Sequence, residues 1–237
     1  MSVQSIHAFA EKVALVTDGA SPIGRAVSLQ LALQGSFVIV AFSDAADEYK
    51  GALAEMQSLG TLAKAVEADI TTPDGIAKLI SEVGSSFGRL DLLVNCLKYL
   101  PQSSFEDSGE LDFDTVVGSN FKAAYLVTNA CLPLMADRPK PRIVNVFTRE
   151  TSENAPLYEA MQSAVEGFTK SLARTLPAKF RVNAVASTAA KSVREGFDPE
   201  LLPMAGTAAA DDTARAVLYL LSPEAVGING QVLEVAG

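Results

Sequence analysis

Two glycines between an apolar strand and an apolar-periodic helix have the spacing of a phosphate-binding turn. Val13–Val16 is a short apolar run, and the helical pattern after it stops near Gly35. Gly19 and Gly24 lie in the turn between them. A strand that turns directly into a helix points free N–H groups and the positive dipole end at the space above the turn. Nucleotide-binding folds place a pyrophosphate there.

The same turn carries two residues that oppose this chemistry. Asp18 and Pro22 stand where glycines would let a phosphate approach. A carboxylate that points into the helix N-terminus occupies its positive end and repels a pyrophosphate. The alternative is that Asp18 only caps the turn. Both interpretations stay open at the level of sequence.

Composition argues against several other kinds of chemistry. The 237 residues include one histidine, His7, so we expect neither a histidine-based triad nor a metal site. Cys96 and Cys131 lack metal-ligand spacing and fit a reducing compartment. The net charge is −9, with 19 basic and 28 acidic residues and no basic cluster, so we expect no nucleic acid or anionic membrane as partner.

No signal-peptide pattern is present, and the longest apolar run, Phe37–Phe42, is too short to span a bilayer, which predicts a cytoplasmic protein.

Strand and helix patterns alternate along the chain, which predicts an α/β fold with a doubly wound parallel sheet covered by helices on both faces. The expected strands are Val13–Val16, Phe37–Phe42, Leu62–Asp69, Leu90–Asn95, Arg142–Phe147, Phe180–Ala186 and Gln231–Val235. The expected helices, besides the one ending near Gly35, are Asp44–Leu59, Thr72–Phe87, Phe113–Met135, Tyr158–Leu176 and Asp211–Leu221. Thr72 or Thr71 should cap the helix Thr72–Phe87, and Gly88 should end that helix. We expect one domain over residues 1–237, with a polar lead-in at 1–11 and a substrate loop or lid at 187–207.

The order and spacing of short motifs resemble the short-chain dehydrogenase/reductase family over nearly the whole chain. The matching positions are Thr17–Gly24 for T-G-x-x-x-G-x-G, Asp69, Asn95–Lys98 for N-N-A-G, Asn120, Thr148, Tyr158 with Gln162 for Y-x-x-x-K, Ser187 with Thr188, and the closing INGQVLEVAG. Within the family, VNCLKYLP, GSNFKA and VNVFT look most like the pteridine-reductase branch. The resemblance implies a single-domain Rossmann-like sheet of seven strands in the order 3-2-1-4-5-6-7.

The resemblance also implies a catalytic set of Tyr158, Thr148, Asn120 and Gln162. In the family the tyrosine exchanges a proton with the substrate oxygen while a nicotinamide exchanges hydride. The step from Thr148 to Tyr158 is shorter here than is usual. Asn120 is expected either to support a water path or only to pack within its helix.

Gln162 is the main departure from the family pattern, because a lysine is expected there. The lysine lowers the tyrosine pKa and holds the ribose hydroxyls, whereas glutamine keeps hydrogen bonding but brings no charge. A tyrosine with a pKa of about 10 is ionised to roughly one part in a thousand at neutral pH. Carbonyl reduction, which needs an acid, should therefore tolerate Gln162 better than alcohol oxidation, which needs a base.

The implied cofactor-binding residues are Thr17, Gly19, Ser21, Ile23, Gly24, Ser43, Asp69, Asn95 and Lys98. Asp69 corresponds to the residue that holds the adenine. The second strand ends without a carboxylate, so NADP(H) is favoured over NAD if a nicotinamide binds, with Ser43 and Arg25 near the 2′-phosphate. Lys98 either replaces the charge missing at position 162 or points to solvent. Arg142 and Arg149, at the ends of one strand, are interpreted as solvated charges.

The departures fall on the cofactor and catalytic surface, while the core strands and the helix Val165–Leu176 keep the family pattern. The leading hypothesis is therefore a family member whose hydride-transfer site is weakened or lost, kept as a binding or assembly subunit. The alternative is a working NADPH-dependent oxidoreductase that reduces a carbonyl or a pterin-like ring, with Tyr158 as the proton donor. A third possibility, non-redox chemistry, has no support in the sequence. The family's dimer face implies a homodimer or homotetramer, or a hetero-oligomer with an active paralogue.

Overall fold

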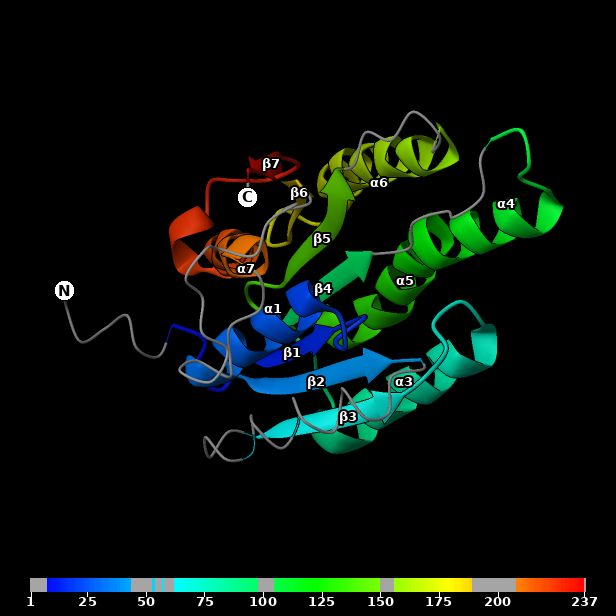
Figure 1. Cartoon of the computed structure of the whole chain (residues 1–237). Coiled ribbons are helices and arrows are strands. Elements are labelled where there is room, and N and C mark those ends of the chain that lie inside the picture. Colours follow the sequence, from blue (N-terminus) through cyan, green and yellow to red (C-terminus); the bar gives the residue numbers. More distant parts are fainter. Residues whose placement is uncertain are drawn as a thin grey trace.

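Seven parallel strands form one sheet in a computed structural model of the chain (Figure 1). The structure describes residues 8–43, 53, 57, 62–97, 105–149, 156–188 and 208–236. The strand order is β3-β2-β1-β4-β5-β6-β7, so the predicted doubly wound topology is confirmed. The strands are β1 (Val13–Val16), β2 (Phe37–Phe42), β3 (Ala63–Glu67), β4 (Leu92–Leu97), β5 (Arg142–Arg149), β6 (Arg181–Thr188) and β7 (Val232–Val235).

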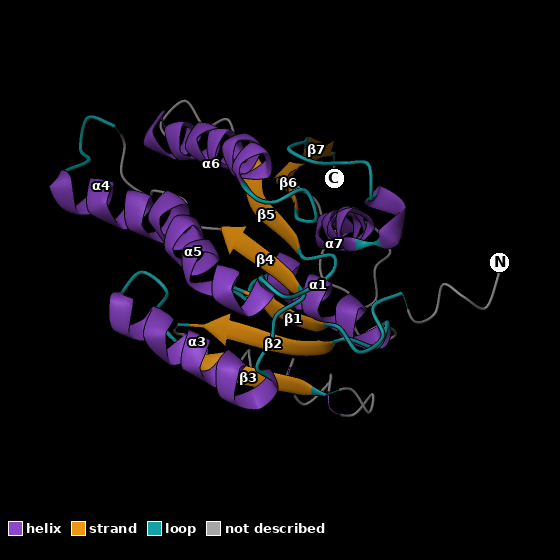
Figure 2. Cartoon of the chain, turned by 180° about the vertical axis from the view of Figure 1, so that it is seen from behind, coloured by secondary structure: helices purple, strands orange, loops and turns teal. Residues whose placement is uncertain are grey.

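Helices cover both faces of the sheet, as Figure 2 shows from behind. They are α1 (Pro22–Leu33), α3 (Pro73–Phe87), α4 (Glu110–Val117), α5 (Ala123–Met135), α6 (Pro156–Thr175) and α7 (Ala208–Leu221), with a short 3₁₀ turn at Pro223–Ala225. Side chains of α1 and α7 form one buried cluster with β1, β4 and β5, and those of α3 and α5 form another on the opposite face. Within the described residues, no helix is both long and apolar enough to cross a membrane.

The central strands are buried on both faces, which explains their continuous apolar sequences. Every residue of β1 and β4 is buried. A parallel strand covered by helices on both sides has no polar face, so its sequence shows no alternation. The chain reverses its direction of winding between β1 and β4, and the carboxyl ends of strands at such a point are where ligands bind in open α/β sheets.

Local signals place the ends of α3 as predicted. The Thr72 hydroxyl accepts a hydrogen bond from the Gly75 amide at 3.2 Å, and Gly88 follows the helix in a left-handed conformation with φ of 62°. Thr72 is therefore the N-cap, and Gly88 relieves the steric cost that a side chain would have there.

Several predicted bounds differ from the structure; for example, β4 runs from Leu92 to Leu97, two residues later than expected, and α7 begins at Ala208 instead of Asp211. The helix expected from Phe113 begins at Glu110 and is divided by a π-helical turn at Gly118–Lys122. Strand β5 runs two residues beyond Phe147 and β6 two beyond Ala186, because the two strands stay paired up to Arg149 and Thr188. The helix Asp44–Leu59, apart from positions 53 and 57, and residues 189–207 of the expected loop lie outside the described residues.

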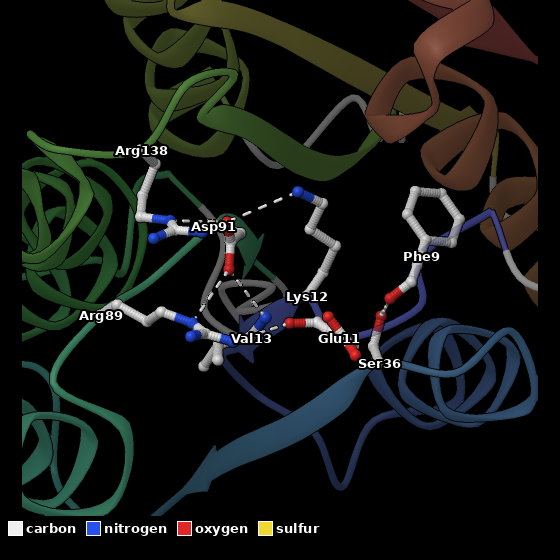
Figure 3. Close-up of polar contacts among 8 residues, drawn as sticks. All are labelled: Phe9, Glu11, Lys12, Val13, Ser36, Arg89, Asp91 and Arg138. Atoms are coloured by element: carbon white, nitrogen blue, oxygen red, sulfur yellow. Dashed lines mark hydrogen bonds and ion pairs between the residues drawn. The ribbon is translucent and has the colours of Figure 1, made fainter.

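A buried carboxylate joins the amino ends of β1 and β4 (Figure 3). Asp91 is 2% exposed, and its carboxylate accepts a hydrogen bond from the Val13 amide at 3.1 Å. Arg138 binds the same carboxylate at 2.8 Å, with Lys12 at 3.7 Å and Arg89 at 3.8 Å. This cluster holds the edge of the sheet opposite to the β1–α1 turn.

Candidate active site

The β1–α1 turn is closed by a serine cap. The Ser21 hydroxyl accepts a hydrogen bond from the Gly24 amide at 3.0 Å and donates one to the Asp18 carbonyl at 2.7 Å. Ser21 is the N-cap of α1, and Pro22 occupies the first helical position, where its missing N–H costs nothing. The Ser21 hydroxyl therefore caps α1 and binds the Asp18 backbone carbonyl, and the interpretation that Asp18 caps the turn stays a prediction.

Both glycines of the turn are required by packing. A Cβ at Gly19 would lie 1.7 Å from the Val40 Cγ1 atom, and one at Gly24 would lie 2.3 Å from the Asp18 carbonyl oxygen. The Gly19 amide donates to the Ala41 carbonyl at 3.1 Å, which ties the turn to β2. The turn thus keeps the close approach of helix and strand that a dinucleotide site needs.

Asp18 adopts a left-handed backbone conformation, with φ of 48°. Glycine takes this conformation without strain, and aspartate is among the few other residues that tolerate it. The negative charge of Asp18 adds to burial in raising the pKa of the Cys96 thiol. The Asp18 carboxylate therefore lies close enough to the carboxyl end of β4 for its charge to act on Cys96.

Thr17 and Asn95 act within the sheet. The Cys96 amide donates to the Thr17 hydroxyl at 3.0 Å, which joins the carboxyl ends of β1 and β4. The Asn95 amide nitrogen donates to the Asn145 side-chain oxygen at 2.8 Å and to the Thr128 hydroxyl at 3.0 Å. Each of these side chains is at most 1% exposed.

This buried network extends to α6 and was missed by the sequence prediction. The Asn145 amide donates to the Thr169 hydroxyl at 2.9 Å, and Thr169 in turn donates to the Val165 carbonyl at 2.8 Å. Asn95 and Asn145 are direct neighbours in the register of β4 and β5. The repeated V-N in VNCL and VNVF was the available signal. The network fixes α6, and with it the position of Tyr158, relative to the centre of the sheet.

The predicted adenine-side residues lie at the carboxyl ends of β2 and β3. The Asp69 carboxylate accepts hydrogen bonds from the Thr71 amide at 2.9 Å and the Thr71 hydroxyl at 2.6 Å. Asp69 and Ser43 are exposed, and Ile23 is half-buried against the core formed by α1 and α7. Asp69 and Ser43 are accessible to a ligand at this edge.

Tyr158 is buried at the start of α6. Its hydroxyl donates a hydrogen bond to the Thr148 backbone carbonyl at 3.1 Å, and the residue is 1% exposed. Gln162 lies one helical turn later and is 5% exposed. Its amide nitrogen is buried and has no hydrogen-bond partner in the described part of the chain.

Asn120 lies in the π-helical turn between α4 and α5. Its side-chain nitrogen donates to the Val116 carbonyl, four residues earlier, at 2.9 Å. A π-helical turn shifts the backbone hydrogen-bonding pattern, and the side chain supplies a donor to a carbonyl of the preceding turn. The Asn120 amide group is thus engaged by its own helix.

Two arginines interpreted as solvated are not. Arg149 is half-buried and pairs with Glu166 of α6 at 2.7 Å and Glu234 of β7 at 3.1 Å. Arg142 is 4% exposed. The extension of β5 carries Arg149 into contact with its neighbours, and the sheet and helices enclose Arg142.

The remaining predicted positions are either buried in the core or outside the described residues. Ser187, at the end of β6, is 3% exposed and accepts a hydrogen bond from the Thr213 hydroxyl at 2.8 Å. Lys98 and His7 lie outside the described residues. Burial raises the pKa of the Cys131 thiol to about 12, so this cysteine is an inert core residue. Within the described ranges no group of three or more metal-ligating side chains gathers, and the expectation of no metal stays a prediction.

Comparisons with known proteins agree with this architecture. Residues 19–237 match the family model described as enoyl-(acyl carrier protein) reductase. A 3-oxoacyl-(acyl-carrier-protein) reductase of Staphylococcus aureus is 30% identical over 238 residues, which cover 95% of this chain and 97% of that protein. A hydroxynaphthalene reductase-like protein of Metarhizium brunneum is 28% identical, with 100% and 97% of the two chains covered.

Solved structures superpose over almost the full length. A dehydrogenase/reductase from Sinorhizobium meliloti has a TM-score of 0.84 at 28% identity, covering 99% of this chain and 98% of its own. A short-chain dehydrogenase from Burkholderia cenocepacia, in complex with NADP, has a TM-score of 0.82 at 29% identity, with 98% of both chains covered. The likeness to the pteridine-reductase branch stays a prediction. The sheet order, the glycine turn, the tyrosine on α6 and these matches together identify the chain as a member of the short-chain dehydrogenase/reductase family.

Proposed function

We propose that this protein is a short-chain dehydrogenase/reductase whose NAD(P)-dependent hydride-transfer site is weakened or lost, and that it serves in the cytoplasm as a binding or assembly subunit. The observation that carries the proposal is the state of Tyr158. Its hydroxyl proton is donated to the Thr148 carbonyl, and the side chain is 1% exposed. A general acid must come within hydrogen-bond reach of the substrate oxygen. Tyr158 in this arrangement lacks that access.

Gln162 adds a second reason. A neutral amide one turn from the tyrosine contributes no positive charge that would lower the tyrosine pKa. Its unpartnered buried nitrogen is a strong hydrogen-bond donor, suited to a ribose hydroxyl or another acceptor. Gln162 can therefore still bind a ribose hydroxyl but cannot activate Tyr158 by positive charge.

The residues present fit a dinucleotide in part. The glycine turn and the N-terminus of α1 retain the backbone approach that suits a pyrophosphate, and Asp69 is exposed at the end of β3. Strand β2 ends in Ala41 and Phe42 without a carboxylate, which favours NADP(H) over NAD. When bound, the nicotinamide would supply or accept hydride. The negative charge of Asp18 at the mouth of α1 weakens the same site for a pyrophosphate.

Exposed apolar side chains support an assembly role. On α4, Leu111 is 81% exposed and Phe113 is 52% exposed, and Tyr125 on α5 is 45% exposed. Phe121 of the π-helical turn, Tyr125 of α5 and Phe168 of α6 form an aromatic cluster, with ring centroids 5.6 to 6.3 Å apart. The exposed surface of α4 and α5 that carries these side chains is a candidate association face, because large exposed apolar side chains are typical of such surfaces. We propose a homodimer or homotetramer through this face, or a hetero-oligomer with an active paralogue.

A working reductase is the second candidate. The chain is 30% identical to a 3-oxoacyl-(acyl-carrier-protein) reductase over 95% of its length, and the β1–α1 turn keeps both packing glycines. In this alternative Tyr158 leaves the Thr148 carbonyl and protonates a carbonyl or a pterin-like ring reduced by NADPH, while Thr148 orients the substrate. The alternative requires a rearrangement at the start of α6.

Titration with NADPH and NADH, followed by nucleotide fluorescence and thermal shift, tests the proposal. The expected result is binding that does not saturate at micromolar concentrations. Gln162→Lys should tighten NADPH binding, and Gln162→Met is the neutral control that should not. Saturable micromolar binding by the natural protein, accompanied by reduction of a 3-oxoacyl thioester, would overturn the proposal in favour of the reductase.

Affinity purification from the source cells tests the assembly role. A stoichiometric paralogue that carries lysine at the position of Gln162 is expected if the protein works in a hetero-oligomer. Recovery of the homo-oligomer alone would remove the paralogue from the proposal.

A further inference from the structure

Arg142 is a buried cation without a counter-charge. It opens β5 and is 4% exposed, and its Nη1 atom is buried without a hydrogen-bond partner in the described part of the chain. No ion pair to its guanidinium occurs among the described residues, whereas Arg149 at the other end of β5 binds two carboxylates. Arginine is almost never fully buried unless it is paired. A guanidinium with a buried, unpartnered Nη1 atom is therefore a feature that calls for a ligand.

Arg181 reinforces the positive charge at this place. Arg142 and Arg181 are register partners on β5 and β6. The Arg181 guanidinium donates to three backbone carbonyls, those of Val226, Ala178 and Phe180, at 2.6 to 2.8 Å, and so stays fixed beside Arg142. Burial, and secondly the charge of Arg181, lower the pKa of Arg142. Arg181 thus adds a second positive charge, fixed by backbone carbonyls, next to Arg142.

The carboxylate of Asp91, whose backbone pairs with Arg142, is already bound by other cations. The Arg142 amide donates to the Asp91 backbone carbonyl at 3.1 Å, but the Asp91 carboxylate is held by Arg138, Lys12 and Arg89 (Figure 3). Side chains alternate along a strand, so Arg142 lies on the face of Val144 and Val146, which pack with α1 and α7. The alternation places the Asp91 side chain with Leu93, in the core of the opposite face.

We propose that Arg142, supported by Arg181, binds a small oxyanion, a phosphate or a carboxylate group, at the amino edge of β5 and β6. A guanidinium presents paired donors that match the oxygens of these groups. A bound oxyanion would supply both the missing hydrogen-bond acceptor and the missing negative charge, whereas a water molecule would supply only the first. The site lies at the edge of the sheet opposite to the β1–α1 turn and is independent of the dinucleotide site.

Thermal unfolding of the full chain in inorganic phosphate, in succinate and in chloride at equal ionic strength tests the site. Phosphate or succinate should raise the melting temperature saturably, by about 3–5 °C at ten times the dissociation constant, relative to chloride. A response to phosphate alone identifies a phosphate site, and a response to succinate alone identifies a carboxylate site. Equal melting temperatures in all three salts would overturn the proposal.

Two variants locate the effect. Arg142→Gln should abolish the anion-dependent shift and leave the melting temperature in chloride equal or higher, because it removes an unpaired buried charge. Arg174→Gln, on the exposed surface of α6, makes the same change in net charge and should keep the shift. Arg142→Lys keeps the charge without the paired donors and should weaken binding. If Arg142→Gln responds to the anion as the natural protein does, the proposal is wrong.

Discussion

At the scale of single residues, Tyr158 and Gln162 determine what the site can do. The tyrosine proton goes to the Thr148 carbonyl at 3.1 Å, and the glutamine nitrogen one turn later is buried without a partner among the described residues. In the proposed function, the hydrogen bond to Thr148 keeps the tyrosine hydroxyl away from a substrate, while the Gln162 nitrogen is a donor without an acceptor among the described residues. A buried donor that lacks a partner carries a desolvation penalty of about 1–3 kcal/mol.

Gln162→Met should therefore stabilise the protein by about 1 kcal/mol, since methionine fills a similar volume and buries no polar group. Urea unfolding followed by circular dichroism measures the change. Gln162→Ala is the control, because the cavity it creates should offset the gain. A loss of stability in Gln162→Met would mean that the amide has a partner in solution.

At the scale of elements, the β1–α1 turn and the Asp91 cluster hold the two opposite edges of the sheet. The turn needs glycines because β2 and the Asp18 carbonyl approach within the space of a methyl group. The cluster needs a carboxylate because three cations and the Val13 amide converge on it. Substitution of Gly19 at one edge, or of Asp91 at the other, should therefore destabilise the protein.

Gly19→Ala should destabilise the protein by about 1–3 kcal/mol through overpacking against Val40. Gly84→Ala in α3 is a matched control, because a Cβ there meets no atom within 4 Å and should stabilise by about 0.5–1 kcal/mol. Denaturant midpoints of both variants measure the difference. Equal effects of the two substitutions would contradict the packing at the turn.

Asp91→Asn should destabilise the protein by about 1–3 kcal/mol, because it removes the buried carboxylate that three partly exposed cations and the Val13 amide bind. Chemical denaturation measures the loss. Glu82→Gln, which breaks the exposed pair between Glu82 and Lys64, should leave the midpoint unchanged. A mild effect at Asp91 would show that solvent compensates the three cations.

At the scale of the whole molecule, the face formed by α4 and α5 should govern assembly. Phe113→Glu with Tyr125→Glu should convert an oligomer into a monomer, because two charges would be buried in the contact. Size-exclusion chromatography with light scattering measures the mass. Leu62→Gln, at a distant exposed leucine before β3, should keep the oligomer. A monomeric natural protein, or an oligomer that survives the double substitution, would exclude this face.

Alternating strand and helix patterns predicted a doubly wound parallel sheet, and the family resemblance implied its strand order. The ends of α3 were predicted because Thr72 and Gly88 act locally. Sequence patterns also placed Tyr158 and Gln162 on one helix. They did not reveal that Tyr158 binds the Thr148 carbonyl, since that contact depends on β5 continuing past Phe147 beside β6. Ser21 was not singled out as the cap of α1, because the sequence does not show which polar side chain of the turn reaches the Gly24 amide.

The burial of Arg142 and the amide pair of Asn95 and Asn145 also escaped prediction. Both depend on strand register and on helices distant in sequence. A strand residue next to a polar turn has the same sequence pattern whether it lies in solvent or beneath a neighbouring helix. The buried polar features of this protein are therefore properties of its tertiary packing.

Steady-state consumption of NADPH with a 3-oxoacyl thioester, compared between the natural protein and Tyr158→Phe, tests the central claim most directly. The buried tyrosine and the neutral Gln162 predict turnover that is indistinguishable between the two proteins. Turnover that is present in the natural protein and lost in Tyr158→Phe would show a working acid at this position and would contradict the account.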